Sequence, residues 1–491
     1  MSKKQKLTMI ITMLMGGFFG LLNETLLVTA LPSIMKDFEI SYTQVQWLTT
    51  AFLLTNGIVI PLSALVIQRY TTRQVFLVGI TIFFLGTLLG GLSPHFATLL
   101  VARIIQALGA GIMMPLMMTT ILDVFQPYER GKYMGIFGLV IGLAPAIGPT
   151  LSGYLVEYFN WRSLFHVVAP IAAVTFLIGF KTIKNVGTTI KVPIDFISVI
   201  FSVLGFGGLL YGTSSISEKG FDNPIVLVSM IGGIALVALF VLRQYRLSTP
   251  LLNFAVFKNK QFTVGIIIMG VTMVSMIGSE TILPIFVQNL LHRSALDSGL
   301  TLLPGAIVMA FMSMTSGALY EKFGPRKLAL VGMAIVVITT AYFVVMDEQT
   351  STIMLATVYA IRMVGIALGL IPVMTHTMNQ LKPEMNAHGS SMTNTVQQIA
   401  GSIGTAALIT ILSHASKNFS PTMSDYNGMN KIDMMNQIKV DTMLHGYHAG
   451  FLFALLITVV SFFCSFMLQD LCYKGRKKKL ILVNKYKLLA I

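Results

Sequence analysis

Long runs of apolar residues alternate with short polar connections along the whole chain of 491 residues. A helix needs about 20 mostly apolar residues to cross a membrane, and fourteen runs reach that length. Because no water is available at that depth to pair with backbone groups, each run is predicted to be a helix and no strand is expected. The fourteen predicted spans are 7–32, 46–67, 75–93, 97–122, 133–155, 162–181, 194–215, 224–242, 261–291, 298–320, 328–346, 351–379, 390–413 and 446–470.

Composition excludes a soluble globular protein. Hydrophobic residues make up 55% of the chain and charged residues only 11%, and the mean hydropathy is +0.78, so an all-α integral membrane protein is predicted. The longest stretch without a strongly apolar run is 415–445, which leaves no room for a soluble catalytic domain. The two cysteines, Cys464 and Cys472, are too few for a metal cluster.

The net charge of +15 would suggest a nucleic-acid partner in a soluble protein, but its distribution indicates topology instead. With a cytoplasmic N-terminus, 25 of the 34 Lys and Arg residues lie inside, 7 outside, and Arg103 and Arg362 within spans. This distribution predicts a cytoplasmic-membrane protein with both termini cytoplasmic and 415–445 outside. The first span, 7–32, is too long for a cleaved signal sequence. No nucleic-acid partner is expected.

An internal repeat divides the chain. Residues 63–79 align without gaps on residues 316–332, at corresponding cytoplasmic turns, as in transporters built from parallel repeats. We therefore predict a six-helix bundle in 1–182 and a second in 258–473. The segment 183–257 is predicted to be a linker with two inserted helices, and 474–491 a basic cytoplasmic tail.

Both copies of the repeat are similar to the loop signature of the major facilitator superfamily, Gly-x-Leu-x-Asp-Arg-x-Gly-Arg-Lys. The first copy keeps Arg69 and Arg73 but has Ala64, Gln68 and Thr71 where the family has Gly, Asp and Gly, which puts gating by this loop in doubt. The second copy matches at Gly317, Leu319, Glu321, Gly324, Arg326 and Lys327.

Two further spans carry similar motifs. Residues 103–111, which begin with Arg103, resemble the family pattern Arg-x-x-Gln-Gly-x-Gly, and Gly148, Pro149 and Gly153 resemble the Gly-Pro signature of its antiporter branches. The small residues and Pro149, which interrupts the hydrogen-bond ladder of a helix, also have a purely structural interpretation. Additional matching segments are 22–32, 161–162 and 299–304.

Together these motifs resemble the fourteen-helix EmrB/QacA drug:proton antiporters, in particular the lincomycin and multidrug exporters of Gram-positive bacteria. The resemblance implies a major facilitator fold of two six-helix bundles plus two inserted helices. It also implies export of amphipathic, often cationic compounds in exchange for protons. The chain departs from the pattern at Asn23, where much of the family has Asp, and at Gln397, where Arg is expected.

Only two carboxylates, Glu24 and Glu280, lie deep in predicted spans. An ionised carboxylate there costs several kcal/mol, so each is expected to bind a proton readily and to serve as a proton carrier. Helical spacing places Gly17 and Gly20 on the face of Glu24, so that face is predicted to meet a helix or a cavity. The alternative is a glutamate that only bonds a neighbouring helix. Glu24 is assigned to proton coupling and Glu280 to cargo.

Methionines favour a cargo role for Glu280. Met273 and Met276 share its helical face, and Met113 and Met117 lie in the fourth span. Methionine adapts to varied ligands, so these four are candidate substrate-binding residues. The alternative is ordinary packing, of which the same spacing is more often typical.

The intramembrane cations Arg103 and Arg362 should face the interior and find partners. Arg103 is a candidate to hold a carboxylate or to stabilise its deprotonated form, and the resemblance favours a role in proton coupling. Arg362 is interpreted as only a structural counterpart. Asp123, at the end of the fourth span, is a gate candidate that could pair with Arg73 or Arg130. The alternative is a solvated helix end.

No phosphate-binding loop occurs in the chain, so a proton gradient rather than nucleotide hydrolysis is the expected energy source. His376 and His388 form no ligand cluster, and neither an enzyme, a metal nor any other cofactor is expected. The expected partners are the lipid bilayer, protons and small amphipathic compounds, with a monomer as the working unit. Export of an endogenous metabolite or lipid, and uptake by symport, remain alternatives.

Overall fold

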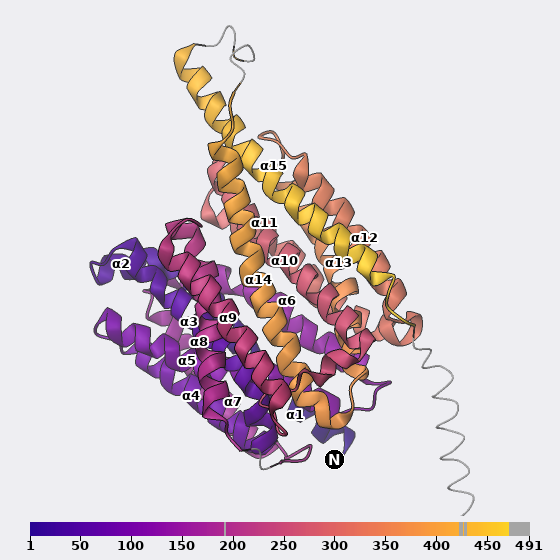
Figure 1. Cartoon of the computed structure of the whole chain (residues 1–491). Coiled ribbons are helices and arrows are strands. Elements are labelled where there is room, and N and C mark those ends of the chain that lie inside the picture. The colour runs from indigo at the N-terminus through magenta and orange to yellow at the C-terminus, as the bar shows by residue number, and fades with distance from the viewer. Residues whose placement is uncertain (191–192, 422–425, 427–429, 471–491) are drawn as a thin grey trace, which may run out of the picture.

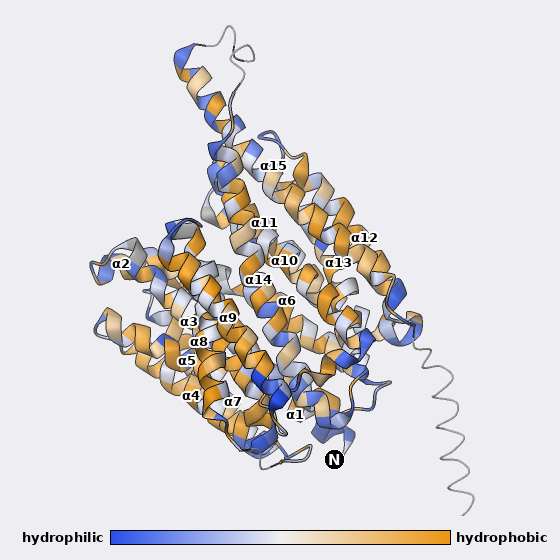
Figure 2. Cartoon of the chain, viewed as in Figure 1, coloured by the Kyte–Doolittle hydropathy of each residue, from blue (hydrophilic) through white to orange (hydrophobic). Residues whose placement is uncertain are grey.

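Helices form nearly the whole molecule. The structure is a computed structural model that describes residues 1–190, 193–421, 426 and 430–470, and these residues contain no β-strand. Within this part of the chain, 14 helices are long and apolar enough to cross a membrane. Hydrophobic residues cover the outer faces of α4, α9 and α12, and hydrophilic residues gather at the helix ends (Figure 2). The predicted all-α membrane fold is confirmed.

Two groups of six spanning helices lie side by side with an inserted pair (Figure 1). The first group comprises α1 (Lys3–Leu26) with η1 (Val28–Ala30) and α2 (Leu31–Asp37), α3 (Tyr42–Arg69), α4 (Thr72–Gly91), α5 (Phe96–Val124), α6 (Arg130–Tyr158) and α7 (Ser163–Thr182). The inserted pair is α8 (Phe196–Lys219) and α9 (Pro224–Arg246), followed by η2 (Phe254–Lys258). The second group comprises α10 (Lys260–Asn289), α11 (Ala295–Phe323), α12 (Pro325–Val344), α13 (Thr352–Asn379), η3 (Pro383–Met385) with α14 (Asn386–Lys417), and α15 (Lys431–Ser465).

The first predicted span is not one continuous helix. α1 ends at Leu26, and a single 3-10 turn then leads into the short α2, which carries Pro32 in its first turn. Proline has no N–H for the helix ladder, so Pro32 cannot bond to the backbone oxygen of Val28. The predicted span 7–32 is present, but it is not one continuous helix beyond Leu26. Glu24 therefore lies in the last turn of α1.

The last span is longer than predicted. α15 begins at Lys431, fifteen residues before the predicted start at 446, because the side chain of Asn430 accepts hydrogen bonds from the backbone N–H groups of Ile432 and Asp433. The apolar run marks only the part of the helix suited to a bilayer, so it could not indicate this polar extension. In Figure 1 the extension projects beyond the other helices.

Small residues bring the two groups together at the end that holds the N-terminus. Gly131 of α6 and Gly317 of α11 lie so close that a Cβ atom on either would overlap the backbone of the other. Nearby, the hydroxyls of Ser63 on α3 and Ser391 on α14 lie 2.7 Å apart. The backbones can approach this closely only because these side chains are small.

The inserted pair is attached through α8. Helix α8 packs against α3 and α14, whereas α9 packs against the outer side of α8. Where the pair enters, Arg243 of α9 donates hydrogen bonds of 2.6 and 2.9 Å to the carboxylate of Asp195, which precedes α8. One of the inserted helices is thus an internal element and the other an external one.

Candidate transport site

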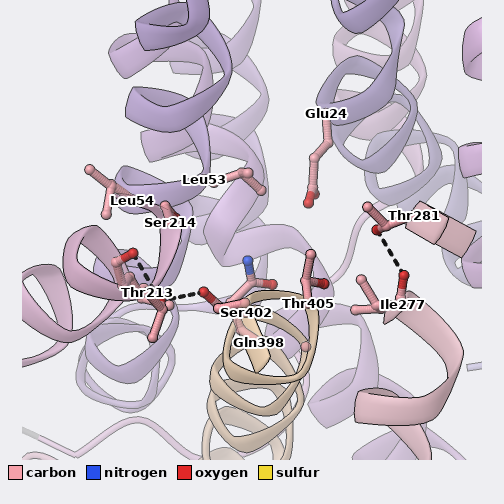
Figure 3. Close-up of a pocket in the computed structure, with 13 residues that line it drawn as sticks. Glu24, Leu53, Leu54, Thr213, Ser214, Ile277, Thr281, Gln398, Ser402 and Thr405 are labelled. Carbon is pink, nitrogen blue, oxygen red and sulfur yellow. Dashed lines mark hydrogen bonds between the residues drawn. The ribbon is translucent and has the colours of Figure 1, made fainter. Parts of the chain in front are cut away.

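A cavity of about 310 Å³ lies where helices of both groups meet the inserted pair. Its walls come from α1, α3, α8, α10 and α14, so no single group encloses it (Figure 3). Apolar side chains and side chains with hydroxyl, amide or carboxyl groups both line it. The apolar residues are Leu53, Leu54, Leu210, Ile277 and Ala406, and the polar ones are Glu24, Thr213, Ser214, Thr281, Gln398, Ser402 and Thr405.

Glu24 is the one ionisable residue among the cavity-lining residues that the structure describes. Its carboxyl group extends from α1 into the space beside Thr281 (Figure 3). Ligand sites for small amphipathic molecules are typically cavities of roughly 300–1,000 Å³ with apolar walls and a few placed polar groups. The cavity therefore has a size within this range, apolar lining residues and one carboxyl group.

Arg103 lies behind Glu24, fully buried, and its hydrogen bonds go to neutral groups. It donates to the side-chain oxygens of Asn23 at 2.6 Å and Gln106 at 3.0 Å. It also donates to the backbone oxygens of Leu48 at 3.3 Å and Asn23 at 3.2 Å, and its guanidinium lies 4.2 Å from the centre of the Phe52 ring. These contacts fix the cation beside α1 without neutralising its charge.

Of the two roles expected for Arg103, holding a carboxylate or stabilising its deprotonated form, the described part of the chain shows no hydrogen bond for the first and an electrostatic interaction with Glu24 in line with the second. The reason is local: Asn23, not Glu24, lies on the side of α1 that faces the arginine. The glycine prediction is confirmed, because Gly17 and Gly20 face α5, where Cβ atoms would meet Met117 and Ala110 at 3.2 and 3.3 Å.

Glu280 occupies a different environment from Glu24. The hydroxyl of Tyr359 on α13 donates a hydrogen bond of 3.3 Å to its carboxylate, and Glu280 does not belong to the described lining of the cavity. Beside it, the buried Arg362 donates to Ser279 at 3.1 Å, to Ser275 at 2.8 Å and to the hydroxyl of Thr340. This carboxylate is held within the second group.

The internal repeat relates these two sites. Gly79 and Gly332, which the repeat aligns, pack against Gly109 and Gly365, so α5 and α13 are placed in the same register. In that register Arg362 is the counterpart of Gln106. By the same offset Tyr359 of α13 corresponds to Arg103 of α5. Arg362, interpreted as only a structural counterpart, thus lies one helical turn from the position that corresponds to Arg103.

The candidate methionines lie in the packed interior. Met113 and Met117 are 2% and 0% exposed, and Met273 and Met276 are 6% and 4% exposed. Met113 fits against Gly79, whereas Met117 fits against Gly17. The structure does not bring the four to the described cavity, and their role in cargo binding stays a prediction.

Asp123 connects the two groups at the end that holds the N-terminus. Its carboxylate accepts a hydrogen bond of 2.8 Å from the side chain of Asn386 on α14. Of the two arginines expected as partners, Arg130 interacts electrostatically with Asp123, whereas Arg73 donates to the backbone oxygen of Phe180 at 2.8 Å. Arg130 also donates to Asn379 of α13 at 2.8 Å. Asp123 is nevertheless exposed at the end of α5, so its role as a gate residue stays a prediction beside the alternative of a solvated helix end.

The loop motifs lie at the same end. Gly324 has a φ of 81°, a conformation that favours glycine, and the backbone N–H of Arg326 donates to Asp470, beyond α15, at 3.3 Å. In the first copy, Thr71 caps α4 through Gln74 instead. Glu321 and Gly317 share the last turns of α11, and Arg69 ends α3. A gating role for these residues remains a prediction.

The Gly-Pro signature lies in α6, which continues through residue 149 without a break. A Cβ atom on Gly148 would overlap the side chain of Thr25, the residue after Glu24. Gly153, in contrast, has no heavy atom within 4 Å of where its Cβ would lie. The two glycines therefore have different surroundings, and only Gly148 is needed for the close approach of α6 to α1.

Sequence reasoning missed part of the cavity wall. Thr213, Ser214, Ser402 and Gln398 were not singled out because a hydroxyl or amide inside a span is ordinary when its own helix backbone satisfies it. The run of Thr213, Ser214 and Ser215 in an inserted span was the one available signal. Within the residues that the structure describes, no group of three or more His, Cys, Asp or Glu side chains could hold a metal ion.

A helical membrane protein with a cavity shared between two repeated groups has the architecture of a transporter. A model of the Major Facilitator Superfamily matches residues 13–405, and the chain belongs to that superfamily.

Two relatives match along most of their length. The chain is 43% identical to the MFS-type transporter YcnB of Bacillus subtilis over 457 residues, covering 93% of this chain and 94% of that protein. It is 38% identical to the lincomycin resistance protein LmrB of Listeria monocytogenes over 468 residues, covering 95% and 98%. The predicted resemblance to drug exporters of Gram-positive bacteria is confirmed at this level.

One solved structure shares the fold. The human organic anion transporter MFSD10 (TETRAN) matches with a TM-score of 0.63, covering 94% of this chain and 99% of that one, at 15% identity. At that identity the likeness supports the fold alone. The chain is a multi-pass membrane transporter of the major facilitator type.

Proposed function

We propose that this transporter exports amphipathic monocations across the cytoplasmic membrane in exchange for protons. The observation that carries the proposal is the placement of a single carboxylate, Glu24, in a cavity to which both helical groups contribute. Its relative LmrB is named for lincomycin resistance, which supports a drug-like cargo. The excess of Lys and Arg at the predicted inner ends supports cytoplasmic termini.

Coupling follows from competition at Glu24. The carboxylate binds either one proton or one cationic group of the cargo, so binding of a monocation releases one proton. Arg103, fixed by neutral partners, attracts the ionised carboxylate from the side opposite the cavity. Because Arg103 keeps its charge throughout, the site has the same net charge with a protonated Glu24 as with a Glu24 that binds a monocation, so the two forms are electrically equivalent in the cycle.

This proposal differs from the division of roles expected from the sequence. From the sequence, Glu24 is assigned to coupling and Glu280 to cargo. We propose instead that cargo and proton bind to the same residue, because Glu24 is the one carboxylate in the described cavity lining. Glu280, held by Tyr359, is proposed to support the packing of α10 on α13. Polar contacts at the other end, between Asp123 and Asn386 and between Ser63 and Ser391, are proposed to form the cytoplasmic gate.

The test is everted-vesicle transport with a panel of cationic dyes, lincosamides and fatty acids. We expect proton-dependent accumulation of a cationic dye by the wild type. Glu24→Gln should abolish dye-induced proton release while leaving part of the dye binding of the purified protein. Normal coupled transport by Glu24→Gln would refute the assignment. Accumulation of fatty acids alone would favour export of a lipid.

A further inference from the structure

The inserted helix α8 supplies part of the cavity, a role that the two repeated groups do not account for. Leu210, Thr213 and Ser214 all lie on the cavity. The outer helix α9 is mostly exposed on the surface of the molecule, with Val228 at 71% and Ile231 at 66%. The two inserted helices therefore differ: α9 faces the surroundings, and α8 faces the site.

Specific contacts hold α8 in this position. Leu210 lies against Gly57 of α3, where an added Cβ atom would overlap the leucine side chain. Tyr211 stacks on Trp47 of α3 with ring centres 5.9 Å apart. On the other side, the hydroxyls of Thr213 and Ser402 on α14 lie 2.6 Å apart. α8 thus bridges the first and second groups beside the cavity (Figure 3).

The direction of the hydrogen bonds limits what three of the cavity hydroxyls, those of Thr213, Ser402 and Thr281, can offer a ligand. Thr213 donates its proton to the backbone oxygen of Leu210 at 3.0 Å, so Ser402 is the donor in the Thr213–Ser402 pair. Thr281 likewise donates to the backbone oxygen of Ile277 at 2.9 Å. With their protons used, these three hydroxyls present lone pairs to the cavity. Glu24, once ionised, also only accepts.

We propose that α8 is a specificity wall of the cargo site, and that the site selects amphipathic cations that carry N–H donors. The inference rests on the proposed function and names its cargo class more closely. A protonated amine satisfies both Glu24 and the hydroxyl pair of Thr213 and Ser402. A quaternary ammonium ion of the same shape has no proton to donate and leaves the buried acceptors unpaired.

The first experiment compares acridine orange, whose protonated ring nitrogen carries N–H, with its 10-methyl quaternary analogue, in fluorescence binding assays on the purified protein. We expect the wild type to bind acridine orange about five-fold more tightly, the effect of about one hydrogen bond. Thr213→Val, which keeps the shape and removes the hydroxyl, should abolish this preference. The matched control is Ser202→Ala, which removes a buried hydroxyl of α8 that has no partner among the described residues and should keep it.

Equal preference in the wild type, Thr213→Val and Ser202→Ala would overturn the inference while leaving cation export intact. If the wild type binds neither dye, the proposed cargo class fails, and a second measurement that needs no cargo decides the role of α8. Cys464 and Cys472 are first replaced by serine. In proteoliposomes, Ser214→Cys should then react with a charged methanethiosulfonate reagent, and Leu204→Cys, exposed elsewhere on α8, should not. Equal reactivity at both positions would show that α8 does not face an aqueous cavity.

Discussion

Arg103 donates a hydrogen bond of 2.6 Å to the side-chain oxygen of Asn23, the residue that immediately precedes Glu24. A buried arginine is thereby fixed by a neutral amide, and its charge remains available to the carboxylate that lines the cavity. The side chain at position 23 thus determines whether the charge of Arg103 acts on Glu24. Asn23 itself is not part of the described cavity lining.

Replacing Asn23 by aspartate should weaken coupling. An aspartate would form an ion pair with Arg103 in the same geometry, and the arginine would no longer act on Glu24. We expect drug-induced proton release to fall by about tenfold, within the usual range of coupling energies, with dye binding largely kept. The control is Asn23→Ser, which keeps a neutral hydrogen-bond acceptor at this position. Unchanged proton release in Asn23→Asp, measured in proteoliposomes with a pH-sensitive dye, would contradict this role.

The two buried arginines should differ when replaced by alanine. Arg103→Ala is expected to abolish transport while the protein remains folded and inserted, because the charge beside Glu24 is lost. Arg362→Ala should affect transport less, because Arg362 joins α10, α12 and α13 through Ser275, Ser279 and Thr340. Its loss should instead lower stability by about 2 kcal/mol, as expected when buried hydrogen bonds to a charged group are removed. Thermal unfolding and dye export measure the two effects, and equal losses of transport and expression in both variants would indicate that both arginines only support packing.

Glu280→Gln should have only a small effect on export. An amide oxygen can still accept the hydrogen bond from Tyr359, so export of a cationic dye is expected to remain within about two-fold of the wild type, the scale of a small change in one hydrogen bond. Tyr359→Phe removes the donor instead and should lower thermal stability more than Glu280→Gln does. If Glu280→Gln lost drug-induced proton release to the same extent as Glu24→Gln, Glu280 would have a direct role in transport.

The ion pair at the base of the inserted helices predicts a dependence on pH. Hydrogen bonds from Arg243 lower the pKa of Asp195 from 3.8 to about 2. Because the pKa is lower in the folded state, the stabilisation is complete above pH 3.8 and is lost as the pH falls toward 2. Asp195→Asn should therefore cost about 1 kcal/mol at pH 7, the upper range for a partly exposed pair, and less at pH 3. A cost that is equal at both pH values, measured by thermal unfolding, would argue against the ion pair.

The spans could be predicted from run length because a bilayer imposes one dimension on every helix. The break after Leu26 and the extension from Lys431 could not, since they depend on Pro32 and on the Asn430 cap rather than on hydropathy. Glu24 and Arg103 were found because charge is costly in a membrane. Their partners were not, because a residue's helical face does not show which neighbour it meets.

The cavity wall from α8 illustrates a further limit. Thr213 and Ser214 have the composition of any polar pair inside a membrane helix, and only the packing of α8 between α3 and α14 brings them beside Gln398 and Ser402. The methionines show the converse. Met113 and Met273 each belong to a group of methionines on one helix, at a spacing that suits a ligand-facing stripe. The same spacing also suits packing in the interior, where Met113 lies against Gly79.

The glycines of the Gly-Pro signature should respond differently to the same substitution. An alanine at residue 148 would overlap Thr25 and approach the backbone nitrogen of Leu26 at 3.4 Å, so α1 must move and Glu24 must move with it. Overpacking of this kind costs about 1–3 kcal/mol. An alanine at residue 153 meets open space and should stabilise the helix by up to about 1 kcal/mol. We therefore expect Gly148→Ala to reduce dye export and thermal stability, and Gly153→Ala to leave export unchanged. The double variant Gly148→Ala with Thr25→Ala should recover much of the export, because the overlapping atoms are removed. Equal export by both single variants would show that close contact between α6 and α1 is not required. Failure of Thr25→Ala to restore export would show that Gly148 acts by another route.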